Sequence, residues 1–156
     1  MKISSYLRIE NIFLDVLLPD KDAALRFVAD ACVKNSIVED GGVLYTGLQE
    51  REMTLSTGVG GGIGFPHTAS EEANDAAVLL IRPKKPIDFE ALDNLPVDII
   101  IAIIVPSNKT TLHIRILARV SRLCKNQDFL TIVRETENSE KLHEEIIKLE
   151  QIVDLF

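Results

Sequence analysis

A glycine-rich segment that ends in a proline and a histidine holds the residues best suited to chemistry. Residues 51–68 read REMTLSTGVGGGIGFPHT, with five glycines within seven positions. Pro66 has a fixed φ and no amide hydrogen, so Phe65-Pro66 is a stiff, extended dipeptide that sets the direction of His67. A neutral imidazole nitrogen is nucleophilic at about pH 7 without a separate base. His67 is therefore a candidate nucleophile, although a single histidine beside a proline is more often structural.

The glycines do not form a nucleotide-binding motif. A Walker A loop ends in Gly-Lys-Ser/Thr, and no lysine follows these glycines. The GxGxxG spacing fails as well, because Ile63 and Phe65 stand where its last glycine is needed. Nucleotide binding is therefore not expected. Gly58 and Gly60 either expose their amides to an anion or simply allow a turn.

Composition and charge narrow the class of protein. The 156 residues are 46% apolar and 26% charged, which is typical of one globular domain with one core. The net charge of −7 disfavours nucleic acid as a partner and suits a basic protein instead. No apolar run approaches the roughly 20 residues of a membrane-spanning helix.

Two further features bear on the compartment. Charged residues interrupt the N-terminal apolar residues, unlike a secretory signal, so a cytoplasmic location outside the membrane is expected. Cys32 and Cys124 lie far apart in amphipathic stretches and form no CxxC pair. They are predicted to be buried thiols rather than a disulfide or metal ligands.

The elements that must position the glycine-rich segment begin with two helices. The first is expected to be capped near Asp20, and the second to start after Asp40 and run towards Arg51. Their apolar stripes fall at Leu25, Val28 and Cys32 in the first helix and at Leu44 and Leu48 in the second.

Two apolar segments downstream are predicted strands. Residues 76–81 (AAVLLI) form a short buried strand closed by Pro83 and Pro86. Residues 97–105 (VDIIIAIIV) are rich in β-branched residues and fit a central strand with helices over both faces. Pro106 is expected to end it.

Two amphipathic helices are expected to follow, over residues 111–125 and 139–153, with Ser139 as a candidate cap of the second. In the first of them, apolar residues share one face and an arginine stripe occupies the other, where exposure to solvent is expected. These residues are Leu112, Ile116, Val120 and Leu123 on one face, and Arg115, Arg119 and Arg122 on the other. Strands and helices interleave, so the predicted fold is a single α/β sandwich over residues 1–156, with a mixed central β-sheet flanked by helices.

Taken together, the motifs resemble a known family. Arg51-Glu52, the loop Ser56-Thr57-Gly58-Val59-Gly60 and the ending Gly64-Phe65-Pro66-His67 are similar to the signature of enzyme IIA domains of the phosphoenolpyruvate-dependent phosphotransferase system, fructose/mannitol class. The resemblance covers nearly the whole chain. It continues in Ile87-Asp88-Phe89, in Asp93-Asn94-Leu95-Pro96-Val97, in Thr111-Leu112-His113-Ile114 and in an acidic helix around 144–150.

The resemblance implies the mannitol-type enzyme IIA fold and a role for each site residue. His67 would be the residue phosphorylated, by the phosphocarrier protein HPr, with Arg51 and His113 supporting the phosphohistidine. Without the resemblance, Arg51 reads as a surface arginine and His113 as a helix residue packed on Leu117. Phe65 would rim an apolar docking surface around the His67 pocket.

The remaining binding residues implied are Ser56, Thr57, Gly58, Gly60 and Pro66, where the two hydroxyls either donate to the phosphoryl group or only shape the loop. The implied mechanism passes a phosphoryl group between proteins and needs no metal or nucleotide cofactor. The chain would then be a phosphotransferase component rather than a stand-alone enzyme.

Three functions remain open at this stage. Residues 93–98 and 105–107 resemble the nitrogen-regulatory members most, and a chain without a fused transporter or phosphocarrier domain is expected. Both points favour a regulator that controls other proteins through its phosphorylation state. The second hypothesis is a sugar-transport component that passes the phosphoryl group to a IIB domain. The third is a protein-binding module without phosphotransfer.

Overall fold

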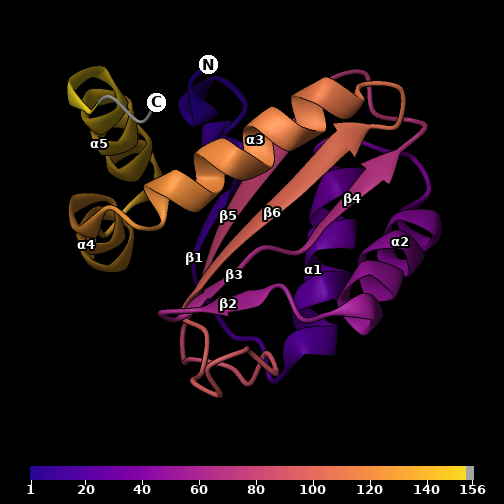
Figure 1. Cartoon of the computed structure of the whole chain (residues 1–156), viewed down its shortest axis with the longest axis horizontal. Helices are drawn as coiled ribbons and strands as arrows, with labels where there is room; N and C mark the ends of the chain where they lie inside the picture. Colours follow the sequence, from indigo (N-terminus) through magenta and orange to yellow (C-terminus); the bar gives the residue numbers. More distant parts are fainter. Residues whose placement is uncertain (154–156) are drawn as a thin grey trace.

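Helices cover both faces of one mixed β-sheet in the computed structural model, which describes residues 1–153 (Figure 1). The strands are β1 (Ile12–Val16), β2 (Gly58–Gly60), β3 (Ile63–Gly64), β4 (His67–Ser70), β5 (Ala77–Pro83) and β6 (Ile99–Pro106). The α-helices are α1 (Lys21–Lys34), α2 (Gly41–Thr54), α3 (Thr110–Leu123), α4 (Gln127–Glu135) and α5 (Ser139–Ile152). Two short 3₁₀ turns, η1 (Ile3–Ser5) and η2 (Ile9–Asn11), precede β1.

The sheet contains parallel and antiparallel neighbours, as the sequence predicts. Its strand order is β1-β5-β6-β3-β2, and β4 also pairs with β6. β1 runs parallel to β5, β5 runs antiparallel to β6, and β3 and β4 both run parallel to β6. The predicted strands at 76–81 and 97–105 correspond to β5 and β6, each displaced by one or two residues.

β3 and β4 lie in line along the same edge of β6, which places the histidine of the glycine-rich segment. Ile63 and Gly64 pair with the first residues of β6, and His67 pairs with Ile103 further along. The dipeptide Phe65-Pro66 breaks the strand between them. The edge stays tied to β6 across the break, because the Ile103 amide donates to the Pro66 carbonyl (3.0 Å).

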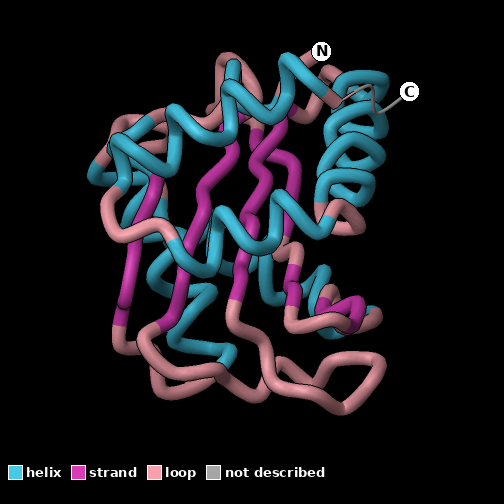
Figure 2. The backbone as a smooth tube through the Cα atoms, turned by 90° about the vertical axis from the view of Figure 1, so that its left-hand side faces the viewer, coloured by secondary structure: helices cyan, strands magenta, loops and turns pink. Residues whose placement is uncertain are grey.

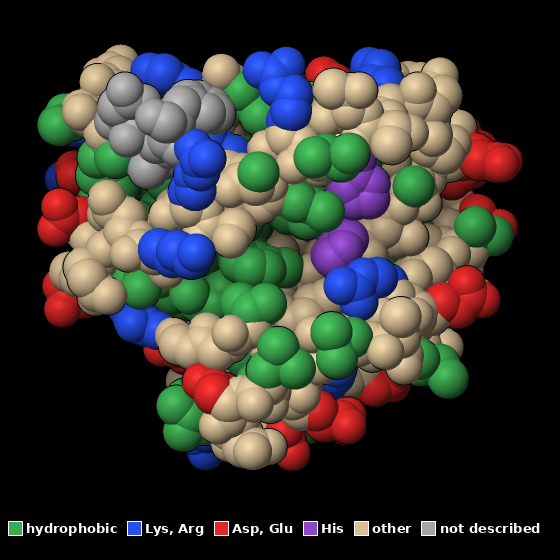
Figure 3. Space-filling view, in the orientation of Figure 1, with side chains coloured by type: hydrophobic (Ala, Val, Ile, Leu, Met, Phe, Trp, Pro, Cys, Tyr) green, Lys and Arg blue, Asp and Glu red, His purple; other side chains and the backbone are tan. Residues whose placement is uncertain are grey.

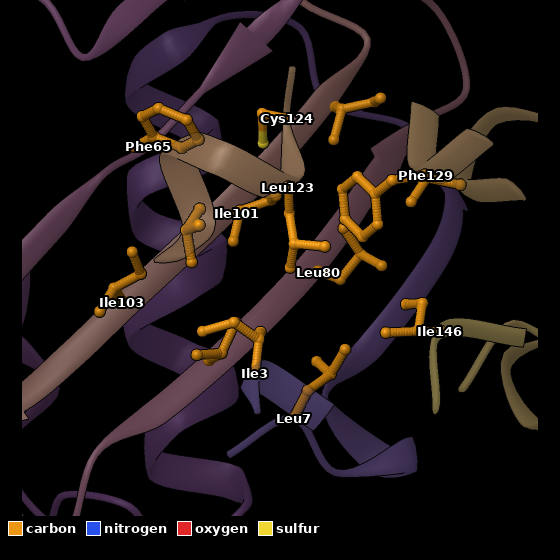
Figure 4. Close-up of a cluster of buried hydrophobic side chains, with 14 of the residues drawn as sticks. Ile3, Leu7, Phe65, Leu80, Ile101, Ile103, Leu123, Cys124, Phe129 and Ile146 are labelled. Carbon is orange, nitrogen blue, oxygen red and sulfur yellow. The ribbon is translucent and has the colours of Figure 1, made fainter. Parts of the chain in front are cut away.

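Alternating residues of β5 and β6 pack into two separate hydrophobic cores, one on each face of the sheet. Val78, Leu80, Ile101 and Ile103 face a core completed by α3, α4, α5 and the N-terminal turns. Figure 4 shows this core, with Phe129, Ile146 and Ile3 converging on the sheet from three elements distant in sequence. The intervening residues of both strands pack against α1 and α2 on the other face. Figure 2 shows the sheet enclosed between these helical layers, the α/β sandwich that the sequence predicts.

The starts of the first two helices agree with the sequence. The Asp20 side chain accepts a hydrogen bond from the Ala23 amide, which confirms the predicted cap. The second helix starts after Asp40 as predicted, and the Asp40 side chain caps it by accepting from the Val43 amide. The last helix is capped by Asn138 instead of Ser139, the predicted residue. Ser139 fails as a cap because its hydroxyl donates to the Ile12 carbonyl on β1 (3.1 Å).

The predicted arginine stripe of α3 is wrong at one position. Arg115 and Arg122 are exposed, but Arg119 is buried beneath α5, where it pairs with Glu150 (3.5 Å). The Glu150 carboxylate also accepts the backbone amides of Ile3 (2.9 Å) and Ser4 (2.8 Å). Arg119 therefore faces α5 and not solvent. The buried Glu150 carboxylate connects α3, α5 and the N-terminal residues.

The region after α3 contains a helix that the sequence analysis does not place. Asn126 caps α4 by accepting from the Phe129 amide, and Phe129, Leu130 and Val133 bury one face. Both cysteines are buried free thiols, as predicted, and burial raises the pKa of each to about 12.

Candidate functional site

His67 is the first residue of β4 and projects its ring into an open pocket. The Nδ1 atom lies 2.7 Å from the Phe65 carbonyl oxygen. A carbonyl can only accept, so Nδ1 carries the hydrogen of the neutral ring and Nε2 keeps its lone pair. The break between β3 and β4 therefore fixes the tautomer as well as the direction of the ring.

The surroundings of His67 keep this ring neutral. Burial is the largest cause that lowers its pKa, because a charged imidazolium loses hydration there, and the nearby charges of Arg51 and His113 lower the pKa further. The hydrogen bond to the Phe65 carbonyl raises the pKa of His67, but by less than burial lowers it. The net result is a pKa below the usual 6.5, so the nucleophilic form predominates at neutral pH.

His113 lies beside His67, on the first turn of α3. The two rings are 5.7 Å apart between centroids and nearly perpendicular, at 81°, and Figure 3 shows two histidine side chains together among hydrophobic ones. Burial lowers the pKa of His113 too. Its Nε2 atom is buried and has no hydrogen-bond partner among residues 1–153. The ring beside the candidate nucleophile thus carries a buried nitrogen that no described residue engages.

The pocket has a volume of about 430 Å³ and combines polar and apolar walls. Its lining residues are Arg51, His67, Thr68, Ala69, Thr110, His113, Ile114 and Leu117. The structure therefore brings together the three side chains that the resemblance implies for catalysis. Arg51 reaches the pocket from the last turn of α2, where its Nη1 donates to the Leu55 carbonyl (2.8 Å).

The two hydroxyls of the loop are directed elsewhere. Thr57 is buried, and its hydroxyl and amide both donate to the Glu52 carboxylate. The Ser56 hydroxyl donates to the Phe89 carbonyl (2.9 Å) and accepts from the Gly58 amide (3.0 Å). These contacts favour the alternative in which both hydroxyls shape the loop.

The glycines form a hairpin turn that points away from the pocket. Gly60, Gly61 and Gly62 all have positive φ, a conformation that side chains disfavour. The turn is held by charged residues, since Arg134 donates to the Gly61 carbonyl (2.8 Å) and forms a two-point ion pair with Asp98. Of the two alternatives for Gly58 and Gly60, the structure favours the turn.

Phe65 does not line the pocket, contrary to expectation. Its side chain is buried in the core beneath α3 (Figure 4). Ile114 and Leu117 on α3 supply the apolar wall of the pocket instead. The pattern of the segment could not show this, because strand residues alternate between faces and the break at Pro66 shifts that alternation.

Sequence analysis did not find the buried ion pair behind Arg51. Glu52 follows Arg51 on the same helical turn and pairs with Lys21 of α1 (2.8 Å) while accepting from Thr57. The Lys21 ammonium also lies 5.0 Å from the centre of the Phe89 ring. An acidic residue directly after the candidate arginine was the available signal.

The described part of the chain contains neither a metal-binding cluster nor a membrane-spanning helix. Within residues 1–153, no group of three or more His, Cys, Asp or Glu side chains is arranged to hold a metal ion. None of the helices over the same residues combines the length and apolar character needed to cross a membrane.

The fold and the site define a class of α/β sandwich domains built around one neutral, accessible imidazole with an arginine and a second histidine beside it. Residues 5–149 match the family described as "Phosphoenolpyruvate-dependent sugar phosphotransferase system, EIIA 2". The chain belongs to this family, and the resemblance seen in the sequence is confirmed.

Individual relatives come from both branches of the family. A "PTS system fructose-specific EIIA component" of Haloferax volcanii is 31% identical over 91% of this chain and 92% of its own length. A "Nitrogen regulatory protein" of Escherichia coli is 30% identical over 99% of this chain and 94% of its own. The structure of nitrogen regulatory protein IIA-Ntr from Neisseria meningitidis superimposes with a TM-score of 0.85 at 24% identity, over 92% of this chain and 98% of that one, which supports the fold.

Proposed function

We propose that this chain is a cytoplasmic phosphocarrier that accepts a phosphoryl group on His67 from phosphorylated HPr. The observation that carries the proposal is the bond between Nδ1 of His67 and the Phe65 carbonyl, which leaves the Nε2 lone pair available in an open pocket. Family membership supports the same role. The chain would be a single enzyme IIA domain whose chemistry requires no cofactor.

The transfer step follows from this geometry. Nε2 of His67 attacks the phosphorus in line, the new nitrogen–phosphorus bond forms, and the bond to the donor's nitrogen breaks with its electron pair leaving on that nitrogen. The ring becomes positively charged as Nε2 bonds to phosphorus. The Phe65 carbonyl, which accepts the Nδ1 hydrogen, stabilises that charge.

The neighbours of His67 suit the negative charge that arrives with the phosphoryl group. The guanidinium of Arg51 can form two parallel hydrogen bonds to phosphoryl oxygens. His113 offers a buried Nε2 with no partner among residues 1–153, and the first turn of α3 adds the positive end of a helix dipole. An open pocket lets a partner protein dock and later remove the group.

The most direct test is intact-mass analysis after incubation with phosphoenolpyruvate, enzyme I and HPr. We expect the wild type and a His143→Ala control to gain one acid-labile phosphoryl group, and a His67→Ala variant to gain none. A folded wild type that gains nothing from active HPr would leave the protein-binding module as the function.

We further propose that the carrier is regulatory and controls other proteins through its phosphorylation state. Similarity to the nitrogen regulatory protein over 99% of this chain supports this. The fructose-specific relative supports a second candidate, a component that passes the phosphoryl group to a IIB domain. Rapid transfer from the phosphorylated chain to a IIB domain would favour the second candidate, and phosphorylation-dependent binding without transfer would favour the first.

A further inference from the structure

A second groove lies on the other side of the last turn of α2 from the His67 pocket. It has a volume of about 470 Å³ and lies between the N-terminus of α1, the end of α2 and the loop of residues 88–96. Three large apolar side chains border it and are mostly exposed: Met53 (78%), Leu55 (57%) and Leu92 (59%). Apolar side chains gathered around one hollow are a feature of binding surfaces.

The loop that presents Leu92 is held firmly in place. The Leu92 amide donates to the Gly58 carbonyl (2.8 Å), and the Phe89 carbonyl accepts the Ser56 hydroxyl (2.9 Å). Glu90 and Asn94 nevertheless adopt left-handed φ values of 52° and 61°. Such conformations are unfavourable for side-chain-bearing residues and persist where the surroundings impose them. Leu92 is therefore presented to solvent by a fixed loop.

The charge around the groove is negative. Lys21 and Asp22 line it, but their charges are balanced by Glu52 (2.8 Å) and Arg26 (2.9 Å). Glu90 at the rim, with Asp88 and Asp93 of the same loop, forms no ion pair within residues 1–153. Of these three, only Glu90 lines the groove, because Asp93 accepts the amides of Gly61 and Leu95 and Asp88 accepts that of Glu90. The groove thus combines apolar contacts with one carboxylate that has no ion-pair partner among the described residues.

We propose that this groove docks a short segment of a regulated protein, in which apolar side chains are flanked by Lys or Arg. The apolar side chains would cover Met53, Leu55 and Leu92, and a basic one would face Glu90 at the rim. This occupant is distinct from the phosphoryl donor, which must cover His67 itself.

One hydrogen bond links the groove to the His67 pocket. Arg51 lines that pocket, yet its Nη1 donates to the carbonyl of Leu55, whose side chain lines the groove. A phosphoryl group on His67 competes for this guanidinium and releases Leu55. The groove described here is therefore that of the unphosphorylated protein, and the docked segment binds this form more tightly. This coupling rests on the proposed function, whereas docking does not.

The test starts with a random peptide library selected on the unphosphorylated wild type. We expect enrichment of peptides with Leu, Ile or Phe next to Lys or Arg. The affinity of a fluorescein-labelled winner, measured by anisotropy, should fall about tenfold with Met53→Ser or Leu92→Ser. It should fall less with Glu90→Gln, in a salt-dependent way. Val43→Ser, which alters an apolar side chain 67% exposed at the other end of α2, is the matched control.

Docking is refuted if no such peptides are enriched, or if the groove variants bind the winner as well as the control does. It is also refuted if Met53→Ser or Leu92→Ser slows phosphoryl uptake from HPr, because the groove would then belong to the donor's contact surface.

The coupling is tested on protein whose phosphorylation has been verified by intact mass. We expect the labelled peptide to bind the phosphorylated form about tenfold more weakly, a coupling within the usual range between two sites. Equal affinity for a verified phosphoprotein refutes the coupling alone. A chain that cannot be phosphorylated refutes both the coupling and the proposed function. In that case, the affinities of the groove variants for the labelled peptide still test docking.

Discussion

Replacing Glu52 by glutamine should show how far a buried ion pair supports the site. The Glu52 carboxylate is 4% exposed, pairs with Lys21 and accepts two hydrogen bonds from Thr57. Glutamine has the same shape and keeps one acceptor for Thr57. Its amide removes the negative charge and one of the two acceptors for Thr57, so the loss combines an unpaired Lys21 with one lost hydrogen bond.

The expected loss of stability is large for a single isosteric change. The Lys21 side chain is 14% exposed, so its ammonium would lose its counter-charge in a place where water replaces it only in part. Removing one partner of a buried pair costs about 3–5 kcal/mol, and the retained Thr57 contact places Glu52→Gln near 3 kcal/mol. For a domain of this length, that lowers Tm by about 6–12 °C.

The assay is urea unfolding followed by circular dichroism, arranged as a double-mutant cycle. Lys21→Met together with Glu52→Gln should recover most of the loss, because neither charge is left alone. The pair formed by Glu144 and Lys148 is exposed on α5 and serves as the matched control, with an expected coupling below about 0.5 kcal/mol. A loss under about 1 kcal/mol, or additive effects like those of the control pair, would refute this reasoning.

Three further predictions concern other parts of the fold. Burial lowers the pKa of His67 and His113, so the unfolded chain binds their protons first, and the free energy of unfolding should fall as the pH drops below 6.5, measured by urea titrations at several pH values. Gly62→Ala should destabilise by about 2–3 kcal/mol, because φ is +83° and a Cβ would lie 2.6 Å from Asp98, whereas Gly61→Ala meets no atom within 4 Å and should cost about 1 kcal/mol. Glu150→Ala should speed hydrogen exchange at the amides of residues 3 and 4, seen by NMR.

Each of these has an outcome that contradicts it. A free energy of unfolding that stays constant below pH 6.5 would contradict the first prediction. An equal decrease when both histidines are replaced by glutamine would show that the two imidazoles do not cause the pH dependence. Equal losses in the two glycine variants would mean that crowding against Asp98 is unimportant. Unchanged exchange at residues 3 and 4 would show that other contacts order the N-terminus.

Local sequence patterns predicted the elements whose environment is set by their own residues. The cap at Asp20, the helix start after Asp40 and the β-branched run of β6 were predicted correctly, since side chain and backbone decide these features within a few positions. The candidate group of His67, Arg51 and His113 was predicted only through the family resemblance, because three separate elements bring these residues to one pocket.

The misses share a physical cause, which is contact with a distant layer. A helical repeat places Arg119 opposite the apolar stripe of α3 but cannot show that α5 covers that side. Thr57 and Ser56 carry hydroxyls suited to a phosphoryl group, yet Glu52 and the loop at Phe89 engage them first. The missing prediction of α4 has another cause, because the Asn126 cap and the apolar spacing of this helix are present in the local sequence.

The contact between Glu150 and the first residues has a consequence for biosynthesis. The amides of Ile3 and Ser4 find their acceptor only in α5, and Ile3 packs in the same core as Ile146. During translation, the N-terminal turn therefore waits for residue 150 to leave the ribosome, whereas α1 and α2 can pair with each other much earlier. Residues 3 and 4, which are synthesised before α1 and α2, are then ordered after them, and until then they remain accessible to chaperones and proteases.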